Sequence, residues 1–230
     1  MAKILFVMTG VDHWTLADGT KHPTGFWAEE AVAPYEAFTE AGHTVTVATP
    51  GGVVPTADAG SLTADANGGQ EGADRIAATL EHEEFRTPVR LADVRLADYD
   101  AVFYPGGHGP MEDLAVNADS GRLLTEALAG GTPLGIVCHA PAAMLAAIKD
   151  DGSNAFAGYR VTAFTNAEET LAGFAEKAKW LLQDRLVEAG VDFQAGEPWK
   201  PHVETDRTLA TGQNPASSGP LAAEILKMLA

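Results

Sequence analysis

The chain has 230 residues, a net charge of −17 at pH 7 and a single cysteine. This length suits one large α/β domain, and one cysteine excludes both an internal disulfide framework and a zinc site built from several cysteines. The negative charge argues against nucleic acid and anionic membranes as partners, because both attract basic patches. No apolar run approaches the ~20 residues that cross a bilayer, so we expect a cytoplasmic protein.

The first half of the chain alternates expected strands with an expected helix. Lys3 to Met8 is apolar, then turns polar without a cleavage region, so we interpret it as a first strand and not as a signal peptide. Glu29 to Ala41 has helical composition and ends before Gly42, which fits a helix C-cap. Thr44 to Thr49 alternates β-branched residues and predicts a second strand. Pro50 to Gly72 is rich in Gly, Pro, Ala and Asp, which predicts an irregular surface segment.

The second half continues this alternation. Asp100 to Tyr104 predicts a third strand, which stops at the glycine-rich turn Pro105 to Gly109. Gly121 to Gly130 predicts a helix, and Leu134 to Val137 is a short apolar run typical of a buried strand. Further along we expect a strand at Tyr159 to Ala163, a helix at Ala175 to Ala189, a strand at Asp206 to Thr211, and a helix from Asn214 to the chain end.

This order of elements predicts an α/β fold, specifically a flavodoxin-like three-layer sandwich with a mostly parallel central sheet. We expect one domain over residues 1–230, with a small cap-like insertion around 50–90. Ligands bind such sheets at the carboxyl ends of the strands. Three loops should therefore share one rim, namely Gly10 to Gly25, Pro105 to Pro110, and Cys138 with His139.

Cys138 stands at the junction between an expected strand and an expected helix. Val137 ends the apolar run, Pro141 suits a first helical turn, and Ala142 to Ile148 contains strong helix formers. A residue at such a junction projects from the sheet edge beside a helix N-terminus, which favours a thiolate. A lone cysteine is often a buried small hydrophobe, but the adjacent His139 favours a nucleophile elbow in which sulfur replaces the serine oxygen.

Two other segments could meet Cys138 at the same rim. The backbone amides of Gly106 and Gly107 could form an oxyanion hole together with the amide of His139, although an ordinary turn has the same composition. Glu29 and Glu30 begin the first expected helix, where acids commonly complement the helix dipole. One of these two carboxyl groups, if it points into the rim, would act as an acid or base toward the thiol.

These motifs together resemble a known family. Gly106 to Gly109, Val137 to Pro141 and Glu30 are similar to the PfpI superfamily of class I glutamine-amidotransferase-like proteins, which includes DJ-1. The closer resemblance is to its Hsp31-like, glyoxalase III branch. It extends from Lys3 to the last helix, and it includes Thr24 to Pro34, Gly158 to Thr170 and Thr211 to Ser217.

The resemblance implies a role for each matching residue. Cys138 would be the nucleophile and His139 its partner, with Glu169 as the acid that orients the histidine; Glu168 is the neighbouring alternative. Glu30 would be the general acid/base that lowers the pKa of the thiol, with Glu29 as the competing assignment. Gly106, Gly107 and His139 would supply backbone donors to the substrate.

The resemblance also implies an activity and its partners. The branch converts methylglyoxal to lactate without a cofactor, and we expect a small aldehyde substrate, no cofactor, no metal ion and a homodimer. The alternatives are a stress chaperone, a protein deglycase, another cysteine hydrolase of the superfamily, or a sensor in which Cys138 is oxidised. The histidines His13, His22, His108 and His202 show no helical metal-ligand pair, so we expect structural or surface roles for them.

Overall fold

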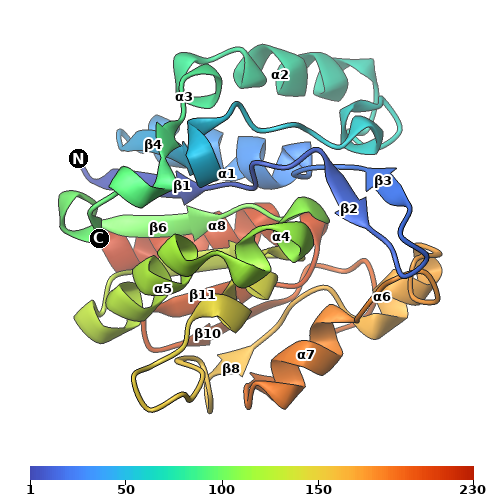
Figure 1. Ribbon diagram of the computed structural model, residues 1–230. Helices are drawn as coiled ribbons and strands as arrows, with labels where there is room; N and C mark the ends of the chain where they lie inside the picture. Colours follow the sequence, from blue (N-terminus) through green and yellow to red (C-terminus); the bar gives the residue numbers. More distant parts are fainter.

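The computed structural model describes all 230 residues and contains a seven-stranded central sheet with helices on both faces (Figure 1). Every neighbouring pair of strands is parallel except the pair at one edge. The expected α/β sandwich with a mostly parallel sheet is therefore confirmed. In spatial order the strands are β10 (Val203–Asp206), β11 (Leu209–Gly212), β7 (Leu134–Val137), β6 (Ala101–Tyr104), β1 (Lys3–Val7), β4 (Thr44–Thr49) and β5 (Val89–Arg90).

The central strands β1, β6 and β7 are almost entirely buried, which explains their unbroken apolar sequences. Helices α1 (Ala28–Glu40) and α8 (Ser218–Leu229) pack together on one face of the sheet, and α5 (Ala118–Gly130) covers the other (Figure 1). No helix is both long enough and apolar enough to cross a membrane.

The segment between β4 and β6 contains more regular structure than expected. Within the predicted irregular and cap-like region lie α2 (Gln70–Leu80), α3 (Glu83–Arg86) and several 3₁₀ turns. Helix α2 packs on α1 (Figure 1). At this contact Arg75 pairs with both Glu29 and Glu36. The Glu29 carboxylate is therefore held on the α2 side of α1.

Three expectations for the second half need correction. The helix expected at Ala175 to Ala189 shortens to α7 (Leu182–Glu188), because the preceding backbone makes a tertiary contact in which Ala17 N donates to Lys177 O. The strand expected at Asp206 to Thr211 is a hairpin of β10 and β11, which turns at Arg207 with φ of 57°. The expected strand at Tyr159 to Ala163 reduces to β8 (Arg160–Val161), which pairs with β9 (Asp192–Phe193) outside the main sheet.

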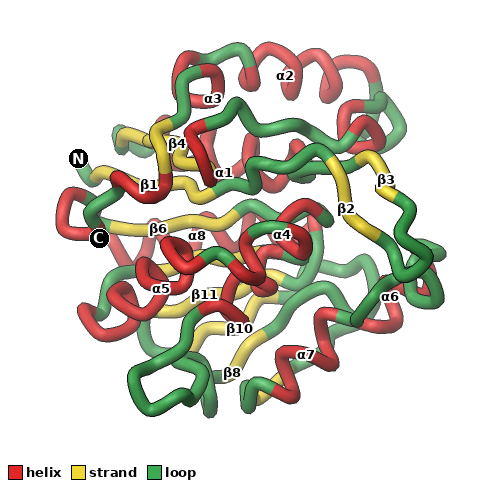
Figure 2. Tube along the Cα trace, in the orientation of Figure 1, coloured by secondary structure: helices red, strands yellow, loops and turns green.

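The loops after β1, β6 and β7 gather beyond the carboxyl ends of these strands, where Figure 2 shows mostly irregular chain. They are joined there by the hairpin of β2 (His13–Thr15) and β3 (Lys21–Pro23) and by α6 (Asn166–Leu171). The amide of Gly109, which begins α4 (Gly109–Glu112), donates to Gly25 O at 2.9 Å and so ties the first loop to the second. The expected shared rim is therefore present.

Candidate active site

Cys138 has the backbone geometry of an elbow. Its φ of 61° lies in the left-handed region, which a non-glycine residue occupies only when its surroundings impose it. The surroundings supply two hydrogen bonds: Cys138 N donates to Gly212 O at 2.8 Å, and Phe164 N donates to Cys138 O at 2.9 Å. The elbow is thus fixed between the end of β11 and the loop that follows β8.

The segment after the elbow is not the α-helix expected at Ala142 to Ile148. It is a 3₁₀ segment over Ala140–Ala146, which begins with Pro141 near its start as expected. A short 3₁₀ segment has poorer hydrogen-bond geometry than an α-helix, so the expected stabilisation of a thiolate by a helix dipole is weaker than the sequence suggests.

The side chains of Cys138, His139 and Glu169 form a continuous chain of contacts. His139 Nδ1 lies 3.3 Å from Cys138 Sγ, and His139 Nε2 donates to Glu169 Oε2 at 2.8 Å. Burial would raise the pKa of the Glu169 carboxyl, but the neighbouring histidines outweigh burial and hold this pKa well below its usual range. Glu169 is therefore an ionised acceptor, which leaves His139 Nδ1 free to accept from the thiol.

The neighbouring Glu168 has a different role. Its Oε2 accepts from the amide and hydroxyl of Thr165 in a capping box, and its Oε1 accepts from Asn214 Nδ2 at 2.8 Å and Trp199 N at 2.9 Å. The structure thus places Glu169, and not Glu168, on His139. The side chain of Asn214 ties Glu168 to the start of the last helical segment instead of capping that segment.

Glu30 reaches the elbow from α1. Its side chain is completely buried, and its Oε2 accepts from Gly106 N at 2.8 Å. Its other oxygen, Oε1, is buried without a hydrogen-bond partner. Burial raises the pKa of Glu30 to about 8, although contacts with Cys138 and with the Gly106 amide oppose this rise. Glu30, and not Glu29, is therefore the carboxyl group that adjoins the thiol.

The electrostatics of Cys138 differ from the expectation. Cys138 is 3% exposed, and burial raises the pKa of its thiol well above the usual value. The adjacent Glu30 carboxylate raises this pKa further, while the Gly107 amide lowers it. The expectation that Glu30 lowers the thiol pKa is wrong for this resting arrangement, since a negative charge on Glu30 disfavours a second negative charge on the neighbouring buried sulfur.

Gly106 and Gly107, in the turn after β6, make different contacts beside Cys138. Gly106 N is already bound to Glu30, so it is not a free oxyanion donor as expected. Gly107, with φ of 97°, directs its amide at the Cys138 sulfur and remains a candidate donor. A side chain at Gly106 would lie 2.5 Å from Val137 O and 2.6 Å from Glu30 Oε2, so only glycine allows this approach.

A cavity of about 340 Å³ opens onto Cys138 and His139. Besides Cys138 and His139, its wall contains four large aromatic side chains, three polar ones, and Gly107, Ala172 and Pro215. The aromatic residues are Trp27, Phe164, Phe174 and Trp199, and the polar ones are His22, Asp58 and His108. Asp58 comes from the segment around 50–90, which therefore contributes to this wall. The roles expected for His22 and His108 are incomplete, because both also line the cavity.

His108 has a specific contact that we did not expect from the sequence. Its Nε2 donates to Glu169 Oε1 at 3.0 Å, so Glu169 binds two histidines, one through each oxygen. The His108 ring stacks on Trp14 at 4.5 Å with an interplanar angle of 10°. The only indication in the sequence is the position of His108 in the glycine-rich turn after β6.

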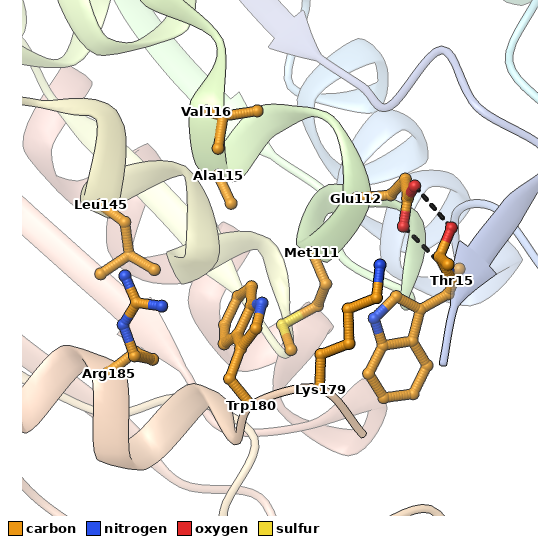
Figure 3. A pocket seen from close by; sticks show the side chains of 10 residues that line it. Thr15, Met111, Glu112, Ala115, Val116, Leu145, Lys179, Trp180 and Arg185 are labelled. Atoms are coloured by element: carbon orange, nitrogen blue, oxygen red, sulfur yellow. Dashed lines mark hydrogen bonds between the residues drawn. The ribbon is translucent and has the colours of Figure 1, made fainter. Parts of the chain in front are cut away.

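Trp14 is held in place by its neighbour Thr15. Glu112 on α4 accepts from the amide and the hydroxyl of Thr15, both at 2.8 Å (Figure 3). These bonds fix the β2–β3 hairpin on α4 and turn the buried Trp14 side chain toward His108. A second pocket, with a volume of about 190 Å³, is lined by residues that include Trp180 and Arg185 but neither Cys138 nor Glu169 (Figure 3).

Three of the site's residues have a donor set that could hold a metal ion. The ligating atoms of His108, His139 and Glu169 all lie within 4.8 Å of one another. Two imidazoles and a carboxylate are a common zinc ligand set. The expectation of no metal site, which came from the absence of a helical histidine pair, overlooked a cluster assembled from three separate segments.

The fold and the site define an α/β protein with a cysteine elbow, a histidine and two buried carboxyl groups beside an open cavity. Residues 23–228 match the DJ-1/PfpI family, and the chain belongs to this family. It is 30% identical over 223 residues to the glutathione-independent glyoxalase HSP31 of Saccharomyces cerevisiae, covering 94% of this chain and 93% of that protein.

Two further proteins extend this comparison. The chain is 28% identical over 244 residues to the protein/nucleic acid deglycase HchA of Staphylococcus aureus, covering 95% of this chain and 77% of that protein. It also resembles the crystal structure of the Rapid Encystment Protein 24 KDa of Francisella tularensis. That likeness has a TM-score of 0.88 and 28% identity, and it covers all of both chains. The relatives thus include proteins named for two different enzyme activities.

Proposed function

We propose that this protein is a glutathione-independent glyoxalase that converts methylglyoxal and water to lactate through a covalent intermediate on Cys138. The observation that supports the proposal most is the unpartnered Glu30 Oε1, which is buried next to the Cys138 thiol, and Cys138 itself lines an open cavity. An unsatisfied buried carboxyl oxygen costs free energy. A substrate that exchanges protons with Glu30 would satisfy it.

The first step forms a carbon–sulfur bond. The Cys138 thiol transfers its proton to Glu30 or to His139 Nδ1, and the sulfur attacks the aldehyde carbon. The carbonyl oxygen becomes the hydroxyl of a hemithioacetal after it gains that proton. The amides of Gly107 and His139 are the proposed donors to this oxygen as its charge develops.

The second step moves hydrogen between two carbons without an external oxidant. Glu30 removes the proton from the former aldehyde carbon, which gives an enediol, and a proton is returned to the neighbouring carbon. The product is a lactoyl thioester, because the first carbon is oxidised as the second is reduced. Water then attacks the thioester, releases lactate and returns the proton to sulfur.

The direct test is lactate formation from methylglyoxal in the absence of glutathione. We expect turnover by the wild type and none above background by Cys138→Ser, with unchanged circular dichroism. Loss of activity is also expected for Glu30→Gln, while Glu29→Gln serves as a matched control because Glu29 pairs with Arg75 outside the cavity. Near-wild-type turnover by Cys138→Ser would contradict the covalent route.

The size of the cavity favours a second candidate, a deglycase that removes aldehyde adducts from larger molecules. A volume of about 340 Å³ lies within the range for drug-sized ligands and exceeds the need of a three-carbon aldehyde. Competition assays with free methylglyoxal and with a glycated peptide distinguish the two. Glyoxalase function predicts the higher kcat/KM for the free aldehyde, and deglycase function predicts the reverse.

A further inference from the structure

The carboxylate of Glu169 joins two histidines that come from separate loops. His108 follows β6 and His139 follows β7, and each directs Nε2 at a different oxygen of Glu169, at 3.0 and 2.8 Å. The two imidazole rings are 4.1 Å apart between centroids. One hydrogen-bonded proton lies between each ring and the carboxylate, so the cluster holds two protons that a cation could replace.

The geometry of this cluster is close to that of a zinc site. Bonds of about 2.0–2.2 Å from a tetrahedral zinc ion to N and O ligands place those ligands roughly 3.3 Å apart. The imidazole-to-carboxylate distances of 3.0 and 2.8 Å are slightly shorter, and all three donors lie within 4.8 Å. A small withdrawal of the Glu169 side chain would therefore create space for an ion between the rings.

The cavity provides access and an open coordination position. His108 and His139 both line it, so an ion bound to their Nε2 atoms could keep a water molecule as a fourth ligand. The nearby Glu168 and the chain's net charge of −17 make the surroundings attractive to a cation. Lys177, which lies over the Phe174 ring at the cavity, is the opposing charge in this region.

Cys138 does not belong to this donor set. Its sulfur contacts His139 Nδ1, which is on the other side of the ring from Nε2. A metal ion bound to His139 Nε2 is therefore not coordinated by the Cys138 sulfur in this arrangement. It would instead replace the Nε2 proton and remove Glu169 as the hydrogen-bond acceptor that orients His139.

We propose that His108, His139 and Glu169 form a binding site for a zinc-like divalent transition-metal ion, and that occupation of this site reversibly inhibits the enzyme. The binding depends only on the three donors. The inhibition rests on the proposed function, since it requires that His139 exchange protons with Cys138 during turnover. The two parts can therefore fail separately, and each needs its own readout.

The binding experiment uses Co²⁺, which reports its ligands by visible absorption. Titration of the full-length protein should give a saturable spectrum of a four- or five-coordinate ion at one ion per chain, which Zn²⁺ displaces. The spectrum should lack a thiolate-to-cobalt charge-transfer band, and Cys138→Ser should give the same spectrum. Absence of saturable binding, or a thiolate band that disappears in Cys138→Ser, would overturn the site.

Variants locate the ligands. His108→Ala and Glu169→Gln should lose the Co²⁺ spectrum, whereas His22→Ala should retain it, because His22 lines the same cavity without touching the carboxylate. Circular dichroism checks the fold of each variant. Equal Co²⁺ binding by folded His108→Ala and wild type would overturn the assignment.

The inhibition experiment measures methylglyoxal turnover at increasing free Zn²⁺, followed by a chelator. We expect a loss of activity with the same midpoint as Co²⁺ displacement and full recovery after chelation. Stoichiometric binding without a loss of turnover would overturn the inhibitory role. If the protein shows no glyoxalase turnover at all, the Co²⁺ spectrum still decides the binding part, so the proposed function fails independently of the metal site.

Discussion

The Glu30 carboxyl group adjoins the Cys138 thiol in a region where both are shielded from water, with Glu30 0% and Cys138 3% exposed. Burial raises the pKa of both groups; the Glu30 carboxylate raises the pKa of the thiol further, whereas contact with Cys138 opposes the rise in the pKa of Glu30. The two groups therefore titrate as a coupled pair, and the apparent pKa values of the two titration steps belong to the pair and not to either residue. The same proximity that keeps the resting thiol protonated places a proton acceptor within reach of it.

The pH dependence of activity should show this shared titration. With the pKa of Glu30 raised to about 8, we expect kcat/KM to increase with pH up to an apparent pKa of about 8, as the pair loses its first proton. Glu30→Gln should remove this dependence from the residual activity. A profile that is flat between pH 6 and 9 in the wild type would contradict the coupling.

The contribution of Glu30 to the stability of the fold should decrease as pH rises, whereas activity should increase. Between its usual pKa of 4.5 and about 8, Glu30 is protonated in the folded protein and ionised in the unfolded chain. This group's contribution to the free energy of unfolding is therefore fully present below pH 4.5 and is lost as pH rises through about 8. Denaturant unfolding measured from pH 5 to 9 should show the wild type losing on the order of a few kcal/mol of unfolding free energy relative to Glu30→Gln as pH rises. Glu29→Gln should show no such change relative to the wild type.

A side chain at Gly106 should damage both stability and activity. The added methyl group of Gly106→Ala would lie 2.6 Å from Glu30 Oε2 and 2.9 Å from Cys138 Cβ. We expect a loss of about 1–3 kcal/mol in unfolding free energy and a larger proportional loss in kcat. Gly219→Ala in α8 is the matched control, since no atom lies within 4 Å of its added methyl group; equal effects of the two changes would exclude the crowding argument.

Trp14 should influence activity through the ring that it stacks on. Trp14→Phe preserves an aromatic face against His108, whereas Trp14→Leu removes it. We expect Trp14→Leu to lower kcat more than it changes KM. Trp14 acts indirectly, because it stacks on His108, and His108 in turn holds Glu169 by a hydrogen bond. Steady-state kinetics on both variants check this; identical kcat values for the two would show that stacking on His108 has no consequence for catalysis.

The sequence could predict those parts of the fold that depend on local patterns. The strands Lys3–Val7, Thr44–Thr49, Ala101–Tyr104 and Leu134–Val137 follow from runs of apolar and β-branched residues, and together they imply the parallel sheet. The first half of the helix expected at Ala175 to Ala189 is absent because backbone pairing of Lys177 with Ala17 outweighed helix propensity. Local propensity contains no information about such distant partners.

Site residues were predictable where a local sequence motif fixed their position. They were not predictable where tertiary contacts decide which of two adjacent residues enters the site. The elbow at Cys138 could be inferred from one strand, one cysteine and one proline. The choice of Glu169 over Glu168 depended on the capping box of Thr165, which occupies Glu168. The second histidine on Glu169, His108, could not be inferred, because its position depends on stacking against a hairpin that the sequence did not reveal.

The central claim is that the Cys138 sulfur becomes bonded to the substrate and carries it as a thioester. Acid-quenched wild-type protein mixed with methylglyoxal should yield a lactoyl adduct on the peptide that contains Cys138, detected by peptide mass mapping, and Cys138→Ser should yield none. Steady lactate production with that peptide unmodified at every quench time, or with the adduct confined to lysine side chains, would contradict the account.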